Sequence, residues 1–403
     1  MQAPNTRSIM VGMPVSDGSR FGTNPLGNNT KSSTPPSKLV TKRAERYAVQ
    51  GIARMLYGKA GFKKGLRHPF EYHRTAKCRH VKISEPQVLK STQYKKAFFT
   101  GLAICGSVWT CPICAAQIQE RRRAEIAKAV DTAYGNKEQN LKAIMVTLTF
   151  SHKHYEKLDE LLKAQGVALG KMRSGKPWQK IKKRVGFQGL IRSLELTFGK
   201  NGWHPHTHEL WFINKNTNIK EFKKTVLRRW ISACSRAGLL DTANFSQLKA
   251  FIKHAVDIKD NARCSEYLAK MDDSSHWGVD SEIAKSSTKK GRKSGVHPFN
   301  FLTQYKNGDE KAGNRWLEYS NAIKGKRQIF WSKGLKKWAG VDEMTDKDLA
   351  EKQENPSIFV DRFSNEEWSI VLKNEARELI LQMAETEGQS AIREWLIKQL
   401  PPD

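Results

Sequence analysis

The chain is predicted to fold as an α+β protein with a central antiparallel sheet, helices on its face and a small cysteine-rich N-terminal module. Residues 190–198 and 203–213 have the pattern of two strands joined in a hairpin by the turn Gly199-Lys200-Asn201-Gly202. The apolar, β-branched run 143–150 is predicted to be a central strand beside that hairpin. The helices that cover the sheet are expected at residues 116–134, 155–184 and 218–237.

Composition divides the 403 residues into four expected regions. Residues 1–38 are rich in Gly, Asn, Ser, Thr and Pro without apolar periodicity, so a disordered basic tail is predicted for residues 1–45. A cysteine-rich module and its helix are assigned to residues 46–140, and the sheet domain to residues 141–345. Residues 346–403 are expected to be an acidic helical tail, which either packs on the basic body or mediates self-association.

The charge of the chain indicates a polyanionic partner. Lys and Arg number 70 against 40 Asp and Glu, which gives a net charge of +30. The acidic tail has 13 acidic and 7 basic residues, so residues 1–345 carry +36. Nucleic acid is the favoured partner, although ribosome-associated and membrane-surface proteins can be equally basic. The mean hydropathy of −0.62 and the lack of a long apolar run or signal region predict a cytoplasmic protein without a membrane segment.

Three histidines alternate along the second strand of the hairpin, at His204, His206 and His208. A strand sends alternate side chains to one face, so these imidazoles are expected to share a face. If Phe198 pairs with Trp203, Glu195 lies opposite His206 and Ser193 opposite His208. Glu195, His206 and His208 then form a metal site that suits Mg²⁺ or Mn²⁺, while three histidines alone also suit zinc. His204 is a third ligand, a phosphate contact or neither; a surface strand with chance histidines is the alternative to a metal site.

Four of the six cysteines cluster near the N-terminus of the predicted fold. Cys111-Pro-Ile-Cys114 is a C-x-x-C knuckle, Cys105 precedes it, and Cys78 is the expected fourth thiolate. This set is typical of tetrahedral structural zinc. His80 is the alternative to Cys78 as a ligand, and a buried or redox-active thiol pair is the alternative to zinc.

The segment 263–270 offers a nucleophile on an expected helix, where Tyr267 and Lys270 lie on one face. A phenol has a pKa near 10, so its attack on phosphorus needs a base, a cation or a metal-polarised phosphate. Lys270 is the candidate cation. A tyrosine and a lysine at this spacing, taken alone, more often serve helix packing.

Two further segments bear on nucleotide chemistry. The lysine-rich segment 285–293 is expected to be a loop that neutralises DNA phosphates, with a solvated loop as the alternative. Its candidate DNA-binding residues are Lys289, Lys290, Arg292 and Lys293. The run Gly170–Pro177 resembles a phosphate-binding loop, but Pro177 replaces the Ser or Thr that holds Mg²⁺. No ATPase is therefore predicted, and duplex unwinding requires a separate helicase.

These motifs, in this order, resemble the plasmid rolling-circle replication initiators of the HUH endonuclease type, over roughly residues 75 to 345. The matching segments are Cys105–Cys114, Thr147–Thr149, Glu195, Gly202–His208, Tyr267–Lys270, His297–Phe299 and Gly325–Ser332.

The resemblance implies an HUH-type nicking and joining domain at residues 141–345 that acts on the double-strand origin of its plasmid. The histidines that match His206 and His208 hold a divalent metal against the scissile phosphate. The tyrosine that matches Tyr267 attacks, leaving a 5′-phosphotyrosyl link and a 3′-OH primer. A host helicase and a DNA polymerase are the implied partners, and no oligomeric state is implied.

Two positions depart from the family's pattern. Thr207 stands between the paired histidines where the family has a bulky apolar residue, and Arg263 stands one turn before Tyr267 where related initiators have a glutamate. The residue that ends a round of replication is therefore left open. A transposase or conjugative relaxase with the same chemistry is one alternative, and a non-catalytic zinc-containing nucleic-acid-binding protein is another.

Overall fold

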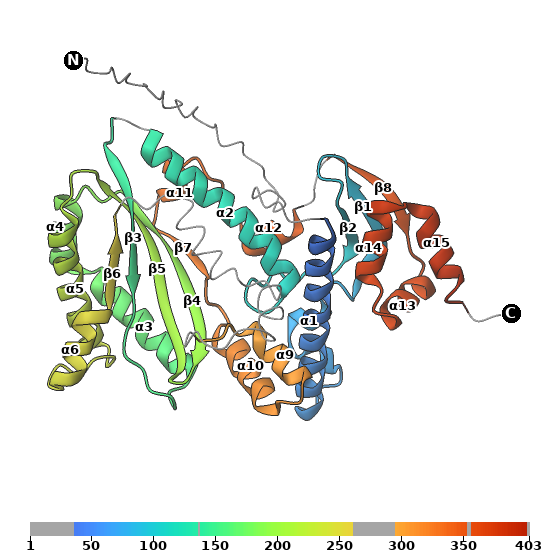
Figure 1. Ribbon diagram of the computed structural model, residues 1–403, viewed down its shortest axis with the longest axis horizontal. Coiled ribbons are helices and arrows are strands. Elements are labelled where there is room, and N and C mark those ends of the chain that lie inside the picture. Colours follow the sequence, from blue (N-terminus) through green and yellow to red (C-terminus); the bar gives the residue numbers. More distant parts are fainter. Residues whose placement is uncertain (1–35, 136–137, 261–294, 353–355, 401–403) are drawn as a thin grey trace, which may run out of the picture.

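Two antiparallel sheets organise the protein (Figure 1). The computed structural model describes residues 36–135, 138–260, 295–352 and 356–400. The main sheet has the strand order β6-β3-β5-β4-β7, and the smaller sheet has the order β2-β1-β8. The strands of the main sheet are β3 (Leu141–Leu148), β4 (Gly189–Gly199), β5 (Gly202–Asn214), β6 (Val256–Lys259) and β7 (Ile329–Trp331). Those of the smaller sheet are β1 (Lys82–Ser91), β2 (Ala97–Leu102) and β8 (Ser357–Arg362).

The helices lie around and between these sheets. In chain order the first half has α1 (Pro36–Lys63), the 3-10 turns η1 (Pro69–Tyr72) and η2 (Arg74–Lys77), α2 (Pro112–Gly135), α3 (Leu158–Met172), α4 (Gly175–Arg184), α5 (Ile219–Arg236) and α6 (Phe245–His254). The second half has α9 (Phe299–Lys306), α10 (Glu310–Ala322), α11 (Leu335–Trp338), α12 (Asp346–Glu351), α13 (Asn365–Lys373), α14 (Arg377–Thr386) and α15 (Gln389–Ile397). None of the helices in the described ranges is long and apolar enough to span a bilayer.

Helices cover both faces of the main sheet, whereas the sequence predicted helices on one. On one face the strands pack against α3, α4 and α5, through side chains such as Trp178 and Trp230. On the other face α2 and α11 cover only part of the sheet, through a cluster that includes Ile126 and Leu335. This double cover explains why β3 is almost entirely buried rather than alternating. No helix among the described residues is part of that cluster besides these two, and the side chains of Glu195, His206 and His208 lie on this second face.

The mixed architecture of antiparallel sheets and helices agrees with the predicted class, and several boundaries differ. The expected disorder of residues 1–45 is wrong for residues 36–45, which belong to α1, and residues 1–35 lie outside the described range. The predicted helix 155–184 is two helices, because the chain turns at Gly175, whose φ is +74°. The short edge strands β6 and β7 were not predicted.

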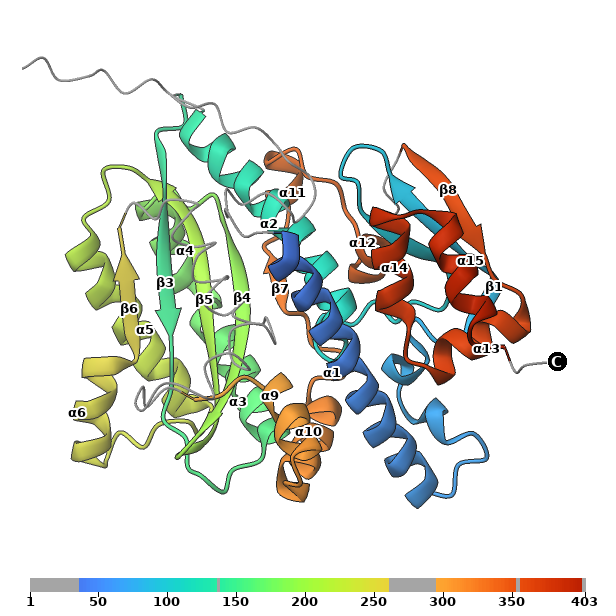
Figure 2. The same ribbon diagram turned by 45° about the vertical axis from the view of Figure 1, so that its right-hand side comes forward.

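The acidic C-terminal region packs on the body of the protein, which is one of the two arrangements left open by the sequence. Strand β8 pairs with β1, so the smaller sheet joins chain segments that are far apart in sequence (Figure 2). Helices α13, α14 and α15 bury Trp368 and Ile380 against this sheet. Arg43 of α1 forms ion pairs with Glu378 and Glu385 of α14, so these acidic residues join the C-terminal helices to α1.

One carboxylate lies deep beneath the main sheet. Glu209 of β5 is fully buried and accepts hydrogen bonds from Arg173 and from Trp211 Nε1, the latter at 2.7 Å. Arg173 is also its ion-pair partner. A buried charge is tolerated only when it is paired and hydrogen-bonded, so this pair links the end of α3 to β5.

Replacing Arg173 alone should therefore be costly. Arg173→Met leaves the Glu209 carboxylate buried without its counter-charge, and we expect a loss of about 3 to 5 kcal/mol of unfolding free energy in urea titrations. The double variant Arg173→Met/Glu209→Gln should recover much of that loss, because no buried charge remains. Equal stability of the single and double variants would contradict this role for the pair.

Candidate metal centres

The β4–β5 hairpin has the register that the sequence predicted. Phe198 pairs with Trp203, Glu195 with His206, and Ser193 with His208. The turn is shorter than expected, because Gly199 and Gly202 still pair and leave Lys200 and Asn201 as a two-residue loop. Gly202 has φ +81°, and a Cβ there would meet the backbone of His154 at 2.8 Å, so only glycine fits this turn.

Glu195, His206 and His208 converge on the partly uncovered face of the main sheet. The Nε2 atoms of His206 and His208 each lie 2.9 Å from the same carboxylate oxygen, Glu195 Oε2. Their side chains are between 13% and 18% exposed, so the cluster is shielded but open to a ligand. Burial raises the pKa of the Glu195 carboxyl, but the two imidazoles outweigh this effect and hold that pKa well below its usual range. The carboxylate is therefore ionised and requires a positive partner.

Hydrogen bonds behind the two imidazoles orient them toward this carboxylate. Thr147 on the adjacent strand β3 places its Oγ1 3.0 Å from Nδ1 of His208. Nδ1 of His206 lies 3.4 Å from the carbonyl oxygen of His204, which can only accept. An imidazole that keeps its proton on Nδ1 has its Nε2 lone pair available to a cation beside Glu195 Oε2. Three electron-donating atoms that converge in this way suit a divalent cation, and the mixed set of two nitrogens and one oxygen fits Mn²⁺ or Mg²⁺.

The third histidine of the run is not part of this group of three. His204 directs its Nδ1 to Nε2 of His152, at 2.7 Å, and Nδ1 of His152 donates to the carbonyl of Asn201 at 2.9 Å. Burial lowers the pKa of His204 to about 4, so it is neutral near pH 7. His152 was missed from the sequence, because only the tertiary fold brings it beside the hairpin.

The candidate nucleophile lies outside the described residues. This applies to Tyr267 and Lys270, and also to the basic residues Lys289, Lys290, Arg292 and Lys293. The described chain on either side adjoins the main sheet: β6 pairs with β3, and Val296 forms a bridge with Phe198 of β4. His297 follows that bridge, and burial lowers its pKa to about 3 while the Glu195 carboxylate opposes the shift. His297 is thus a neutral imidazole within electrostatic reach of the cluster.

The four N-terminal cysteines form a second candidate metal centre. Cys78 follows η2, Cys105 follows β2, and Cys111 and Cys114 flank the start of α2, where all four are buried. The sulfur of Cys78 lies 3.6 Å from that of Cys114 and 3.7 Å from that of Cys111, and Cys105 lies 3.7 Å from Cys114. A tetrahedral zinc with bonds of about 2.3 Å requires sulfurs about 3.8 Å apart, whereas a disulfide requires about 2.05 Å. The spacing therefore suits zinc and excludes a disulfide.

Charge around the cysteines supports the same reading. The Arg79 guanidinium is buried, and although burial opposes its charge, the Cys78 sulfur raises the pKa of Arg79 above its ordinary value. Four thiolates around a divalent metal retain a negative charge, which a buried arginine compensates. His80, the alternative ligand, directs Nδ1 to the Cys78 carbonyl and to Arg377 instead of joining the group of four.

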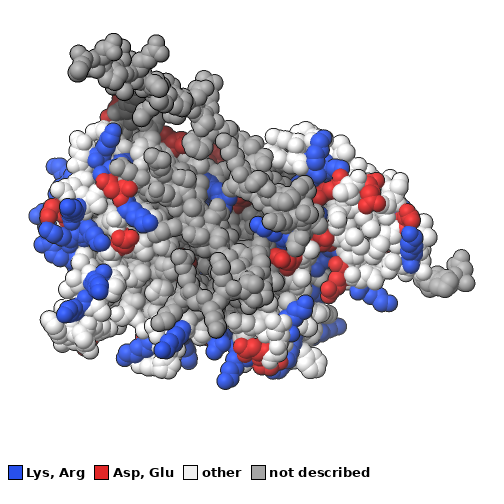
Figure 3. All heavy atoms as spheres, viewed as in Figure 1, with Lys and Arg blue, Asp and Glu red and all other residues white. Residues whose placement is uncertain are grey.

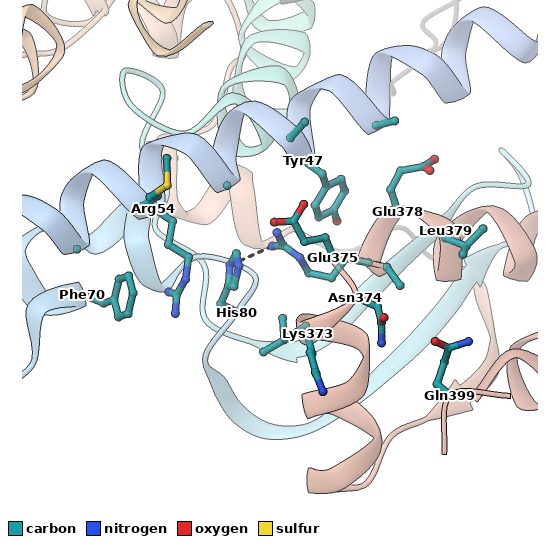
Figure 4. A pocket seen from close by; sticks show the side chains of 18 of the residues that line it. Tyr47, Arg54, Phe70, His80, Lys373, Asn374, Glu375, Glu378, Leu379 and Gln399 are labelled. Carbon is teal, nitrogen blue, oxygen red and sulfur yellow. Dashed lines mark hydrogen bonds between the residues drawn. The ribbon is translucent and has the colours of Figure 1, made fainter. Parts of the chain in front are cut away.

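The loop from Cys78 to His80 also holds three helices. The carbonyl of Cys78 accepts from Gln50 of α1, that of Arg79 accepts from Arg377 of α14 at 3.1 Å, and that of His80 accepts from Trp368 of α13 at 3.0 Å. A cavity of about 900 Å³ lies beside this loop, between α1 and the C-terminal helices. Figure 4 shows Tyr47, Arg54 and His80 on its walls, and no residue of the histidine cluster lines it.

The three consecutive arginines of α2, Arg121 to Arg123, make contacts within the protein. Arg122 forms ion pairs with Glu125 and Asp346, and Arg123 forms one with Glu120. Arg121 donates to the carbonyls of Leu349 and Lys352, near the end of α12. These arginines hold α12 on α2. Cys234 of α5 is buried in the hydrophobic core.

Zinc content gives a direct test of the cysteine centre. The purified protein is expected to hold one zinc per chain by elemental analysis, and Cys111→Ser should lose it. Loss of a structural metal is among the changes that lower the unfolding free energy by more than about 4 kcal/mol. Thermal unfolding of Cys111→Ser should therefore begin at a much lower temperature than that of the wild type. Cys234→Ala is the matched control and should keep its zinc. A zinc-free but equally stable wild-type protein would contradict the assignment.

Thr147 gives a test of the histidine centre. Thr147→Val keeps the shape of the side chain but removes the hydroxyl that orients His208, and loss of such an outer contact typically weakens metal affinity about 10- to 100-fold. Titration calorimetry with Mn²⁺ measures this change, and Thr147→Ser should restore binding. The control Thr149→Val removes a hydroxyl that bonds the His254 carbonyl instead. Equal effects of the two valine variants would exclude an orienting role.

Comparison with known proteins agrees with these motifs. A family model described as "Replication protein" matches residues 100–376, well over half of the chain. "Protein rep" of Streptomyces lividans is 28% identical over 303 residues, which cover 60% of this chain and 65% of that relative. A protein of Streptomyces cyanogenus with the name "Neomycin resistance protein" is 31% identical over 151 residues, or 31% of this chain and 34% of that relative.

The chain thus spans less than two thirds of the length of either relative. No solved structure matches it. The matched range includes Glu195, both cluster histidines and three of the four cysteines, whereas Cys78 precedes it. The resemblance to replication initiators that the motifs indicated is confirmed, and the chain belongs to the replication protein family.

Proposed function

We propose that this protein is a plasmid rolling-circle replication initiator of the HUH endonuclease type, which nicks and rejoins one strand of its replication origin. The observation that carries the proposal is the convergence of Glu195, His206 and His208 on one face of the main sheet. A divalent metal at this position supplies positive charge to a phosphate whose charge increases during reaction. The basic charge of the chain and its family membership support DNA as the substrate.

In the proposed reaction the phenol of Tyr267 attacks the scissile phosphorus. A bond forms between phosphorus and the phenolic oxygen, the bond to the 3′ oxygen of the preceding nucleotide breaks, and the phenol proton leaves to a base. The departing oxygen takes up a proton and becomes a free 3′-OH, while the 5′ phosphate stays on Tyr267. Lys270, one helical turn away in the sequence pattern, is the proposed cation beside the phenol.

The covalent link explains how the same site can rejoin DNA. The phosphotyrosyl bond retains the energy of the phosphodiester, so attack by a 3′-OH on that phosphorus reverses the first step without an external energy source. The free 3′-OH serves as a primer for a DNA polymerase. Because the sequence lacks a complete phosphate-binding loop, a separate helicase unwinds the duplex in this scheme.

An adduct assay tests the nucleophile. Labelled single-stranded DNA from the replicon that encodes the protein is mixed with wild-type protein in Mn²⁺ or in EDTA, and the products are separated on a denaturing gel. We expect a Mn²⁺-dependent protein–DNA adduct that Tyr267→Phe abolishes. Tyr305→Phe is the matched control, because it removes only a hydroxyl that accepts from Lys59.

The same adduct assay tests the two histidines of the cluster. His206→Ala and His208→Ala should abolish the adduct, whereas His254→Ala, on the exposed surface of α6, should not. An adduct that survives in Tyr267→Phe moves the nucleophile to another residue. No adduct under any condition favours a non-catalytic, zinc-containing nucleic-acid-binding protein.

A further inference from the structure

Two neighbouring helices on the back of the main sheet carry an unusual excess of positive charge. Helix α4 has five basic residues and no acidic one, and α5 has six basic residues and one acidic residue, Glu221. The helices are adjacent, since Arg184 of α4 donates to the hydroxyl of Thr225 on α5 at 3.0 Å. We call the outward side of this pair the α4–α5 surface. The exposed basic residues of the two helices are Lys176, Lys180, Lys183, Arg184, Lys220, Lys224, Arg228 and Arg236.

Few of these cations are paired with a described acidic side chain, in contrast to those of α2. Within the described chain the ion pairs of α4 and α5 are Lys224–Glu221 and Lys223–Asp257. Arg229 donates to the carbonyls at the end of α3 and is structural. Like charges held close together without counter-charges repel, so the array costs stability in the free protein. A bound polyanion removes that cost.

The apolar sides of both helices face inward. Trp178 and Ile181 of α4 and Phe222, Val226 and Trp230 of α5 are buried on the sheet. The outward side therefore presents charge without exposed aromatic or large aliphatic side chains. Figure 3 shows Lys and Arg gathered at the edge of the molecule over α4 and α5, with few Asp or Glu.

This composition discriminates between anionic partners. Proteins that bind single-stranded nucleic acid stack its bases on exposed aromatic rings. Amphipathic helices at membrane surfaces insert apolar side chains into the lipid. The α4–α5 surface offers neither feature. A cationic surface without rings suits the regular phosphate backbone of a duplex, whose binding depends on charge and on release of counterions.

The position of the surface separates it from the candidate nicking site. Because side chains alternate along a strand, Glu195, His206 and His208 lie on the face opposite the one that packs on α4 and α5. DNA bound to the α4–α5 surface is therefore not at the histidine cluster. The two faces can bind different parts of one DNA molecule.

We propose that the α4–α5 surface is a second nucleic-acid site, which binds the phosphate backbone of duplex DNA flanking the strand presented to the histidine cluster. The biological role of this surface rests on the proposed function. The binding itself is independent of metal and of sequence. The surface thus supplies affinity for the duplex, and the opposite face supplies the chemistry.

A charge-neutral variant of the full-length protein tests the proposal. Lys180, Lys183, Lys220 and Arg228 are changed together to Gln, and binding to a short labelled duplex is measured in EDTA at several salt concentrations. The control changes four other exposed lysines to Gln: Lys306, Lys311, Lys324 and Lys373. Both variants have the same net charge, and thermal unfolding confirms that both are folded.

In the α4–α5 variant the slope of log affinity against log salt should become shallower by about 3 to 4, with a loss of at least about tenfold in duplex affinity. The control should bind nearly as the wild type does. Adduct formation with a short single-stranded oligonucleotide should be unchanged in both variants, whereas nicking of supercoiled plasmid should fall in the α4–α5 variant alone. Duplex binding is measured in EDTA, where the proposed metal-dependent nicking does not occur. The binding result therefore does not depend on whether the protein nicks DNA.

Two results would overturn the assignment. Unchanged duplex binding in the α4–α5 variant, or an equal loss in the control, would mean that net charge and not this surface binds the duplex. Retained duplex binding with loss of binding to vesicles of phosphatidylcholine and phosphatidylglycerol would assign the surface to anionic lipid.

Discussion

Backbone pairing between β4 and β5 fixes the positions of the candidate catalytic groups, from the Gly199–Gly202 turn to Gly189 and Phe212 at the far end. Side chains alternate in direction along a strand, so a slip of one residue would send His206 and His208 into the core and Glu209 to the open face. Several features oppose such a slip. The turn accepts only glycine at position 202, and Glu209 has fixed donors beneath the sheet. The histidine cluster and the buried ion pair are thus two results of one register.

The second organising element is the loop that begins at Cys78. Its backbone carbonyls hold α1, α13 and α14, while the Cys78 sulfur belongs to the group of four cysteines. The N-terminal module and the C-terminal region are therefore one structural unit, built from the two ends of the described chain. The four cysteines also belong to the large core cluster that includes Trp203 and Trp211 of the main sheet, so this loop joins the unit to the sheet domain. Glu195, His206 and His208 lie on β4 and β5 of the main sheet and do not take part in the contacts of this loop.

The basic side chains of the helices fall into two groups, those with partners in the protein and those that face solvent. The arginines of α2 are neutralised by acidic partners or donate to carbonyls, and they fasten α12 to the body. The cations of α4 and α5 have few such partners and face outward. A sequence shows both sets as basic runs on helices. Only the positions of the acidic side chains distinguish cations that stabilise the fold from cations that remain for a ligand.

Local pattern alone determined the hairpin, its register and the cysteine group. These depend on short-range rules: period-two alternation places Glu195 opposite His206 once the turn is set, and close cysteine spacing is typical of a metal site. The tertiary structure decided what depends on contacts between distant segments. It brought His152 to His204, paired β8 with β1 and placed α4 and α5 opposite the metal face. Such contacts leave no periodic signal in the sequence, because each depends on how whole elements pack and not on the residues beside it in the chain.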